Sequence, residues 1–219
     1  MSSSRIPIIE RIMGANEELA SQNRRMLDAH NVHCVNFMAA PGAGKTSLII
    51  RTAEALNGQR SIGVIEGDVA STVDAEKVRD AGLPVVQINT GGACHLDATQ
   101  VHRALGELNL DGIELLFVEN VGNMICPVAF DLGEHTRVAI SSIPEGDDKP
   151  HKYPSIFASV DALVINKTDL LPHIPFDLTE FRRLARGLNP RIRIFEVSCV
   201  TGAGLDEWAE WLIERTARM

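Results

Sequence analysis

The sequence lacks an excess of basic residues. Lysine and arginine together number 21 against 29 aspartates and glutamates, and the formal net charge at pH 7 is −8. A protein that binds nucleic acid broadly needs a basic footprint on its surface. This charge balance argues against that class, and we expect no nucleic acid among the partners.

The sequence also lacks a hydrophobic run long enough to cross a membrane. A transmembrane helix needs about 20 consecutive apolar residues, and no stretch of this chain approaches that length. Near the N-terminus, Glu10 and Arg11 interrupt the apolar residues before a signal-peptide-like core develops. We therefore expect a cytoplasmic protein that does not associate with a membrane.

Cysteines are few. The chain contains four, at positions 34, 94, 126 and 199, which are too scattered for the disulfide framework of a small secreted domain. In a reducing compartment such residues either fill the core or bind metal. Each one therefore has to be judged from its setting.

Apolar residues are plentiful and recur in short runs. They make up 45% of the 219 residues, which is enough for one substantial core, so we expect a single domain over residues 1–219. Short β-prone runs alternate with helix-like segments. The strand candidates are 32–37, 61–66, 85–89, 113–119, 137–143, 162–165 and 192–197, and the helix candidates are 45–57, 70–82, 96–108, 177–188 and 204–217. This alternation predicts an α/β fold, with a mostly parallel sheet of about seven strands flanked by helices on both faces.

Residues 1–30 form a helical extension in front of the core at 31–219. Apolar residues recur at helical spacing from Ile6 to His30, and Gly14 interrupts them, so we expect either a bent helix or two helices. Two interpretations are open for this segment. It packs on the flank of the sheet, which we favour, or it presents a surface to a partner.

A glycine-rich loop lies between the first strand and the helix that follows it. It ends in Gly44-Lys45-Thr46, although Ala39 replaces the first glycine of the G-x-x-x-x-G-K-[ST] pattern. In a strand–loop–helix context this pattern predicts a phosphate-binding loop of the P-loop NTPase (G-domain) type, with Lys45 at the β- and γ-phosphates and Thr46 on Mg²⁺. The residues predicted to bind the nucleotide here are Pro41, Gly42, Ala43, Gly44, Lys45, Thr46 and Ser47.

A second motif, Asn166-Lys167-Thr168-Asp169, follows the strand at 162–165. The Asp169 carboxylate can accept two hydrogen bonds from guanine, which adenine cannot offer. Asn166 can bond the O6/N7 edge of the base, and the stem of Lys167 can cover the ring. A third loop after the last strand supplies Ser198, Cys199 and Val200. We therefore predict a site for GTP and GDP.

Acidic residues complete the expected chemistry of hydrolysis. Asp68 and Glu119 each follow a strand and are predicted, with Thr46, to hold Mg²⁺. An alternative for Asp68 is a helix N-cap. Asn123 stands where small GTPases carry a water-orienting glutamine, and because its side chain is shorter we expect a catalytic role with slow intrinsic hydrolysis.

Three further side chains are candidate ligands for a transition metal. Cys94, His95 and Cys126 lie in segments that follow neighbouring strands, on the nucleotide side of the sheet. Thiolate and imidazole groups suit Zn²⁺ or Ni²⁺. Their spacing follows neither Cys-x-x-Cys nor His-x-x-x-His, so simple packing remains the alternative for the cysteines.

Taken together, these motifs resemble those of the hydrogenase nickel-incorporation GTPases, the HypB family of SIMIBI-class P-loop GTPases. The resemblance rests on Pro41-Gly42-Ala43-Gly44-Lys45-Thr46, Glu66-Gly67-Asp68, Cys94-His95-Leu96-Asp97-Ala98, Glu119-Asn120-Val121-Gly122-Asn123, Cys126-Pro127, Glu145-Gly146-Asp147-Asp148-Lys149-Pro150 and Asn166-Lys167-Thr168-Asp169.

The resemblance implies a nucleotide-dependent homodimer that delivers nickel to the large subunit of [NiFe]-hydrogenase, together with a small zinc- and nickel-binding accessory protein. It also implies that Cys94, His95 and Cys126 bind metal near the dimer interface. The N-terminal cysteine-rich nickel site of some members and the histidine-rich stretch of others are absent from this sequence.

Two other functions stay open at the level of sequence. One is a different metal- or cofactor-chaperone GTPase, of the urease or cobalamin-enzyme accessory type. The other is a regulatory GTP-binding switch in which the cysteines hold a structural zinc. Transfer of nickel to an apo-enzyme would separate the regulatory switch from the chaperones.

Overall fold

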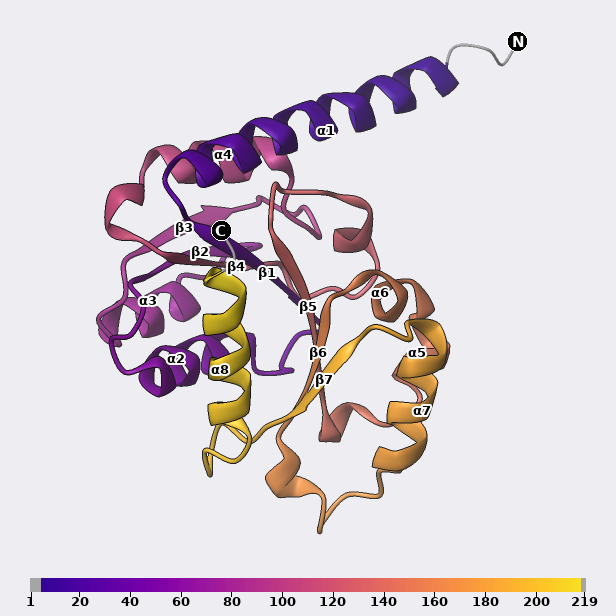
Figure 1. The fold of residues 1–219 in the computed structure, drawn as a ribbon. Helices are drawn as coiled ribbons and strands as arrows, with labels where there is room; N and C mark the ends of the chain where they lie inside the picture. Colours follow the sequence, from indigo (N-terminus) through magenta and orange to yellow (C-terminus); the bar gives the residue numbers. More distant parts are fainter. Residues whose placement is uncertain (1–4, 218–219) are drawn as a thin grey trace.

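The computed structural model describes residues 5–217, with side chains described from residue 14 onward. The first four residues of the predicted extension (1–30) and the last two of the predicted core (31–219) lie outside this part. One sheet of seven parallel strands runs through the described chain, which confirms the predicted α/β class (Figure 1). The strands are β1 His33–Ala39, β2 Ile62–Asp68, β3 Val85–Asn89, β4 Leu115–Glu119, β5 Thr136–Ser142, β6 Ala162–Asn166 and β7 Arg193–Glu196.

Helices connect the strands and cover the sheet on both faces, because parallel strands need crossover connections. The α-helices are α1 Arg5–Ala29, α2 Lys45–Leu56, α3 Val73–Asp80, α4 Ala98–Gly106, α5 Lys149–Lys152, α6 Pro154–Ser159, α7 Leu178–Leu188 and α8 Leu205–Thr216. Four 3-10 turns complete the set: η1 Leu110–Gly112, η2 Cys126–Ala129, η3 Ile143–Glu145 and η4 Thr168–Leu170. None of these helices combines the length and the apolar character needed to cross a bilayer.

Side chains that alternate along the strands divide the core between the two faces of the sheet. Phe37 and Phe117 point to one face, where they pack with Trp208 of α8 and with α2 and α3. The opposite face carries two clusters, one beneath α1 and α4 and the other beneath α6 and α7. Every strand of the sheet is therefore covered by apolar side chains on both sides, as the apolar runs predicted.

The strand order brings the candidate site residues to one edge of the sheet. The order is β3-β2-β4-β1-β5-β6-β7, so β1 lies between β4 and β5. From β1 the chain passes to β2 and β3, returns to β4 beside β1, and then adds β5, β6 and β7 on the other side of β1. Ligands of such folds bind beyond the carboxyl ends of the strands where the order reverses. The loop after β1 therefore lies between the loops that follow β4 and β5, and the loop after β6 comes next beyond β5.

Helix α1 runs without a break through Gly14, and so it is neither bent nor divided. It lies along α4, and its N-terminal part extends beyond the sheet (Figure 1). Asn16, Ala20, Asn23 and Leu27 are buried on one side of this helix. Asn23 donates to the carbonyl oxygens of Ala98 and Leu132 at 2.9 Å each. These contacts fix the second half of α1 to the flank of the core, as favoured from the sequence.

Candidate functional site

The phosphate loop has the conformation that a bound phosphate chain requires. It joins β1 to α2, and Gly42 and Gly44 have positive φ values of 77° and 98°. A side chain at Gly44 would collide with Asn166 Nδ2. Helix α2 begins at Lys45 and receives no side-chain cap from Gly44, so its first N–H groups are free to face an anion. The loop therefore fits the phosphates of a nucleotide.

The base-recognition motif is bonded directly to this loop. Asn166 Nδ2 donates to the carbonyl of Ala43 at 3.0 Å, and Lys167 Nζ donates to the carbonyl of Gly42 at 2.7 Å. Lys167 has a positive φ of 61°, which is uncommon for a residue with a side chain. The predicted base and phosphate contacts thus belong to one continuous surface.

Asp169 is oriented by the loop that follows β7. Ser198 is buried, and its Oγ donates to Asp169 Oδ1 at 2.5 Å. Cys199 is half-buried, and burial raises the pKa of its thiol. Val200 is exposed. The structure therefore brings Asp169 together with Ser198 and leaves Val200 at the surface.

Glu119 joins the phosphate loop to β4. Thr46 Oγ1 donates to Glu119 Oε1 at 2.9 Å, and Lys45 Nζ lies 3.9 Å from the same oxygen. Glu119 is only 3% exposed. The structure thus brings together three of the residues predicted to serve hydrolysis and Mg²⁺ binding.

Glu119 also belongs to a group of three carboxylates that was not predicted from the sequence. Oxygen atoms of Glu66, Asp74 and Glu119 lie within 4.8 Å of one another. Glu66 on β2 and Glu119 on β4 are paired across the two strands. Glu66 could have been noticed in the sequence, because it is a charged residue within the Val/Ile-rich run at 61–66. Asp74 gave no signal of its own, because it lies inside the helix predicted at 70–82.

The electrostatics of this group fit a divalent cation. Burial, followed by the neighbouring Glu119 carboxylate, raises the pKa of Glu66 to about 8. Burial also raises the pKa of Glu119 to about 7, against the lowering effect of Lys45. Glu66 and Glu119 each have one buried carboxylate oxygen, Oε2, without a hydrogen-bond partner in the described part of the chain. Oxygen ligands of this kind suit Mg²⁺.

Asp68 lies outside this carboxylate group. Its Oδ1 accepts hydrogen bonds from the backbone N–H groups of Ala70 at 2.9 Å and Ser71 at 2.7 Å. These bonds lower the pKa of Asp68. Helix α3 begins later, at Val73, with Thr72 as its N-cap. Asp68 therefore stabilises the turn after β2 and is not the N-cap of α3.

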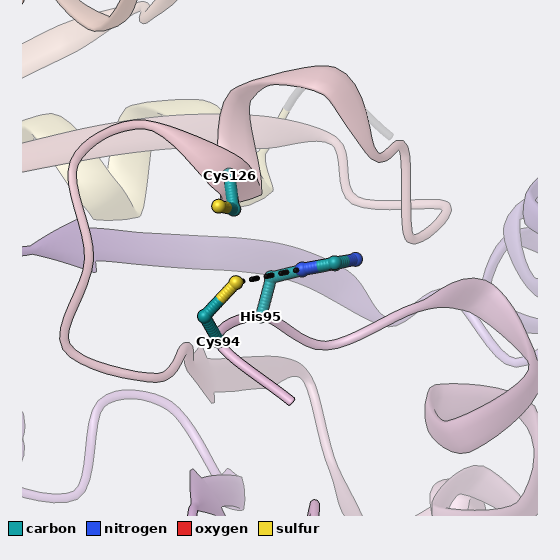
Figure 2. A group of neighbouring side chains, drawn as sticks. All are labelled: Cys94, His95 and Cys126. Carbon is teal, nitrogen blue, oxygen red and sulfur yellow. Dashed lines mark hydrogen bonds between the residues drawn. The ribbon is translucent and has the colours of Figure 1, made fainter. Parts of the chain in front are cut away.

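Cys94, His95 and Cys126 form a second group of possible ligands. Their sulfur and nitrogen atoms lie within 4.8 Å of one another. Cys94 and His95 come from the loop between β3 and α4, and Cys126 comes from the start of η2 (Figure 2). Cys94 is exposed, and the other two are half-buried. Two segments of the sequence thus converge as the strand-end argument predicted.

The protonation of these groups reflects their contacts. A hydrogen bond with Cys126 raises the pKa of the Cys94 thiol. Burial lowers the pKa of His95, which favours the neutral imidazole that binds metal. The His95 ring lies against Phe130, with ring centroids 3.9 Å apart. This set of donors fits a thiophilic divalent metal such as Zn²⁺ or Ni²⁺.

The segment after β4 contacts both sites. Gly122 lies so close to the phosphate loop that a Cβ atom there would be 2.9 Å from Pro41 Cγ. Asn120 accepts a hydrogen bond from the backbone N–H of Leu96 at 3.1 Å. Asn123 donates one to the carbonyl of Cys94 at 3.2 Å. Residues 119–126 therefore connect the phosphate loop to the metal-ligand loop, which we define as residues 90–97.

Comparisons with known proteins identify the family of this chain. The family model described as "CobW/HypB/UreG, nucleotide-binding domain" matches residues 34–196. Hydrogenase maturation factor HypB of Azotobacter vinelandii is 49% identical over 214 residues, which cover 97% of this chain and 70% of that protein.

Two solved structures are similar in fold over most of this chain. The crystal structure of hydrogenase maturation factor HypB from Archaeoglobus fulgidus has a TM-score of 0.87 and 42% identity, over 93% of this chain and 99% of that one. The structure of HypB from Helicobacter pylori in complex with nickel has a TM-score of 0.89 and 32% identity, over 93% and 96% of the two chains. This chain therefore belongs to the HypB hydrogenase maturation factors, within the CobW/HypB/UreG nucleotide-binding family.

Proposed function

We propose that the protein hydrolyses GTP and carries nickel for insertion into [NiFe]-hydrogenase. The observation that supports this most directly is the continuity of residues 119–126. Glu119, at one end, is hydrogen-bonded to Thr46 of the phosphate-loop helix. Cys126, at the other end, completes a ligand group with Cys94 and His95. One short segment thus contacts both the proposed nucleotide site and the proposed metal site.

The nucleotide half uses the residues around the phosphate loop. Lys45 is placed to stabilise charge on the transferring phosphoryl group. Thr46 and Glu119 are candidate Mg²⁺ ligands, joined by Glu66 and Asp74, and Asp68 stays a candidate from the end of β2. Bound Mg²⁺ would neutralise charge on the phosphates. Asp169 selects guanine, and Asn166 and Lys167 hold the base-recognition loop on the phosphate loop.

The metal half uses a site that suits temporary binding. Cys94, His95 and Cys126 are three ligands, so a fourth position is left for water or for an incoming ligand. The structure of the Helicobacter pylori relative is a complex with nickel, and the donor set here suits nickel as well as zinc. The partners we propose are a second copy of this chain, a small zinc- and nickel-binding accessory protein and the hydrogenase large subunit.

Two measurements on the purified protein test this proposal. Wild-type protein should hydrolyse GTP slowly, on the order of minutes or longer per turnover, as small GTPases do without a partner. Lys45→Ala should abolish that turnover and leave nickel binding intact. A Cys94→Ala/Cys126→Ala double variant should lose nickel binding and still bind GTP. Nickel binding that persists undiminished in the double variant would refute the metal half, and turnover many times per second would refute the expectation of slow hydrolysis.

A further inference from the structure

Both ends of the Asn123 side-chain amide are hydrogen-bonded beside the metal-ligand cysteines. Its Nδ2 donates to the carbonyl of Cys94 at 3.2 Å, and its Oδ1 accepts from the backbone N–H of Ile125 at 2.9 Å. Ile125 immediately precedes Cys126. One side chain therefore connects the backbone at the first thiol to the backbone next to the second.

Apart from Asn123, the loop that carries Cys94 is supported by bonds between near neighbours, in which Thr90 Oγ1 donates to the carbonyl of Ala93 at 2.8 Å. Gly91, Gly92 and Ala93 are exposed, as is Cys94 itself. Both glycines have positive φ values, of 61° and 111°. The base of the loop is fixed separately, because Leu96 is fully buried, packs against Gly67 and donates its N–H to Asn120. Asn123 thus holds the part of the loop that carries the ligand, and Asn120 holds its base.

We propose that Asn123 is a positioning residue for the metal site, which sets the distance between the Cys94 and Cys126 thiols. The inference rests on the proposed function of these cysteines as metal ligands. The side-chain amide of Asn123 supplies both the donor and the acceptor that these two bonds need, whereas a carboxylate lacks the donor and alanine lacks both. Groups that orient metal ligands from outside the coordination sphere typically contribute 10- to 100-fold to metal affinity.

This position also bears on hydrolysis. Asn123 stands where small GTPases place the glutamine that orients the attacking water. An amide bonded to Cys94 and Ile125 has its donor directed at the metal-ligand loop. The two roles require different partners for the same Nδ2 group. Removing the amide should therefore weaken metal binding if Asn123 positions the ligands, and it should slow GTP hydrolysis if Asn123 orients the attacking water.

The test compares Asn123→Asp and Asn123→Ala with wild type in full-length, GDP-bound protein. Dissociation constants for Ni²⁺ and Zn²⁺ would be measured by competition with a chelator, and GTP hydrolysis would be measured with Mg²⁺ alone. Both variants should bind each metal about tenfold more weakly, the lower end of the range for such groups. In both variants the hydrolysis rate should fall by a smaller factor than the metal affinity, whereas a role in orienting the attacking water would give the reverse.

Asn89→Ala is the matched control. Asn89 Oδ1 accepts a hydrogen bond from Gly91 N–H at 3.0 Å, so this variant removes an asparagine that supports the same loop without touching Cys94 or Cys126. Its metal affinities should match those of wild type. An equal loss in Asn89→Ala would show that any loosening of the loop has this effect, and would overturn the assignment to Asn123.

A second readout needs no metal. A short bifunctional thiol reagent should bridge Cys94 and Cys126 in metal-free wild-type protein, because their sulfur atoms lie within 4.8 Å. Bridging should be slower in both Asn123 variants and unchanged in Asn89→Ala. Equal bridging rates in the Asn123 variants and wild type would contradict a role in setting the distance between the thiols.

The outcomes separate this inference from the proposed function. Unchanged metal affinity with abolished hydrolysis in the Asn123 variants would assign the amide to the attacking water and overturn the inference alone. Nickel binding that does not depend on Cys94 and Cys126 at all would remove the metal site, and the proposed function would fall together with the inference.

Discussion

Asp169 and Ser198 come from loops that follow neighbouring strands, and their side chains share a 2.5 Å hydrogen bond. The bond restrains the orientation of the Asp169 carboxylate through Oδ1, and it leaves Oδ2 without a bond to Ser198. Guanine presents two adjacent N–H donors to such a carboxylate, whereas adenine presents none in the same position. We therefore expect discrimination between the bases to depend on this residue.

Asp169→Ala should reduce GTP affinity and leave ATP affinity, already weak, nearly unchanged. A pocket built to hydrogen-bond its ligand discriminates by a factor of about 10⁴ or more against an analogue that lacks the bonding groups, so most of the preference should disappear. Equilibrium binding of labelled GTP and of labelled ATP measures this preference. Asp80→Ala, at an exposed site at the end of α3, is the control. GTP binding by Asp169→Ala that equals wild type would show that another group reads the base.

His33 makes stability depend on pH. It is 5% exposed, and its Nε2 lies 2.9 Å from Thr136 Oγ1. Burial, with His135 second, lowers the pKa of His33 from 6.5 to about 4. The folded state therefore resists protonation, and the unfolded state does not. The stabilising contribution is complete above pH 6.5 and is lost progressively as the pH falls to about 4.

The loss should amount to about 3 kcal/mol of unfolding free energy, since each unit of pKa difference corresponds to about 1.4 kcal/mol. Urea unfolding of wild type and His33→Leu at pH 8, 6 and 4.5 tests this. The leucine variant cannot take up the proton, so its stability should fall less steeply over this range. Parallel curves for the two proteins would mean that another group governs the acid sensitivity.

At the scale of elements, buried amides help to hold α1 on the core, beside the apolar packing of Ala20 and Leu27. Asn23 is fully buried, its Nδ2 donates to two carbonyl oxygens, and its Oδ1 lies 2.8 Å from His102 Nδ1. The carbonyl groups belong to Ala98 of α4 and to Leu132 in the loop before β5. One side chain thus joins three segments of the fold.

Asn23→Ala should lower the free energy of unfolding by about 2–3 kcal/mol, because it leaves buried polar groups without partners. Protection of the α1 amides from hydrogen exchange should fall by more than that of the α2 amides. Ser21→Ala is the matched control on the same helix, since Ser21 is exposed and bonds only to Glu17. If the two variants have equal stability, the buried amide does not hold the helix.

Some elements follow from local sequence and others do not. The run 85–89 is short and β-branched, and β3 spans the same residues. The continuous α1 was not foreseen, because Gly14 costs about 1 kcal/mol in a helix, and only tertiary contacts of Asn16 and Asn23 show why the helix persists. Helices α5 and α6 have 4 and 6 residues, which is too short for a periodic pattern to reveal them.

At the scale of the whole molecule, the sequence located the candidate site well, because parallel strands bring their following loops to one edge. Cys94 and Cys126 are 32 positions apart in the chain, and they were placed together by that argument and by the family resemblance. Glu66 and Asp74 were missed because their place beside Glu119 depends on strand register and on where α3 begins. Register across a sheet is set by packing, which a local pattern does not contain.

The connection between the two sites predicts thermodynamic linkage. If a GTP analogue changes nickel affinity by some factor relative to GDP, nickel must change affinity for the GTP analogue relative to GDP by the same factor. We expect the GTP state to favour both the dimer and tight metal binding. Nickel titrations in the two nucleotide states, with sedimentation to follow association, measure both effects. Identical nickel affinities in the two states would show that residues 119–126 do not transmit the nucleotide state.

The exposure of Cys94 has a kinetic consequence. A metal held at an exposed thiolate, with a coordination position open, can be approached by a new ligand before the old ones leave. Exchange would then be associative, and its rate would rise with the concentration of the competing ligand. A small thiol chelator should therefore strip nickel at a rate proportional to chelator concentration. A rate that stays constant as chelator is added would instead identify spontaneous dissociation as the limiting step, and an acceptor enzyme could not then hasten its own loading.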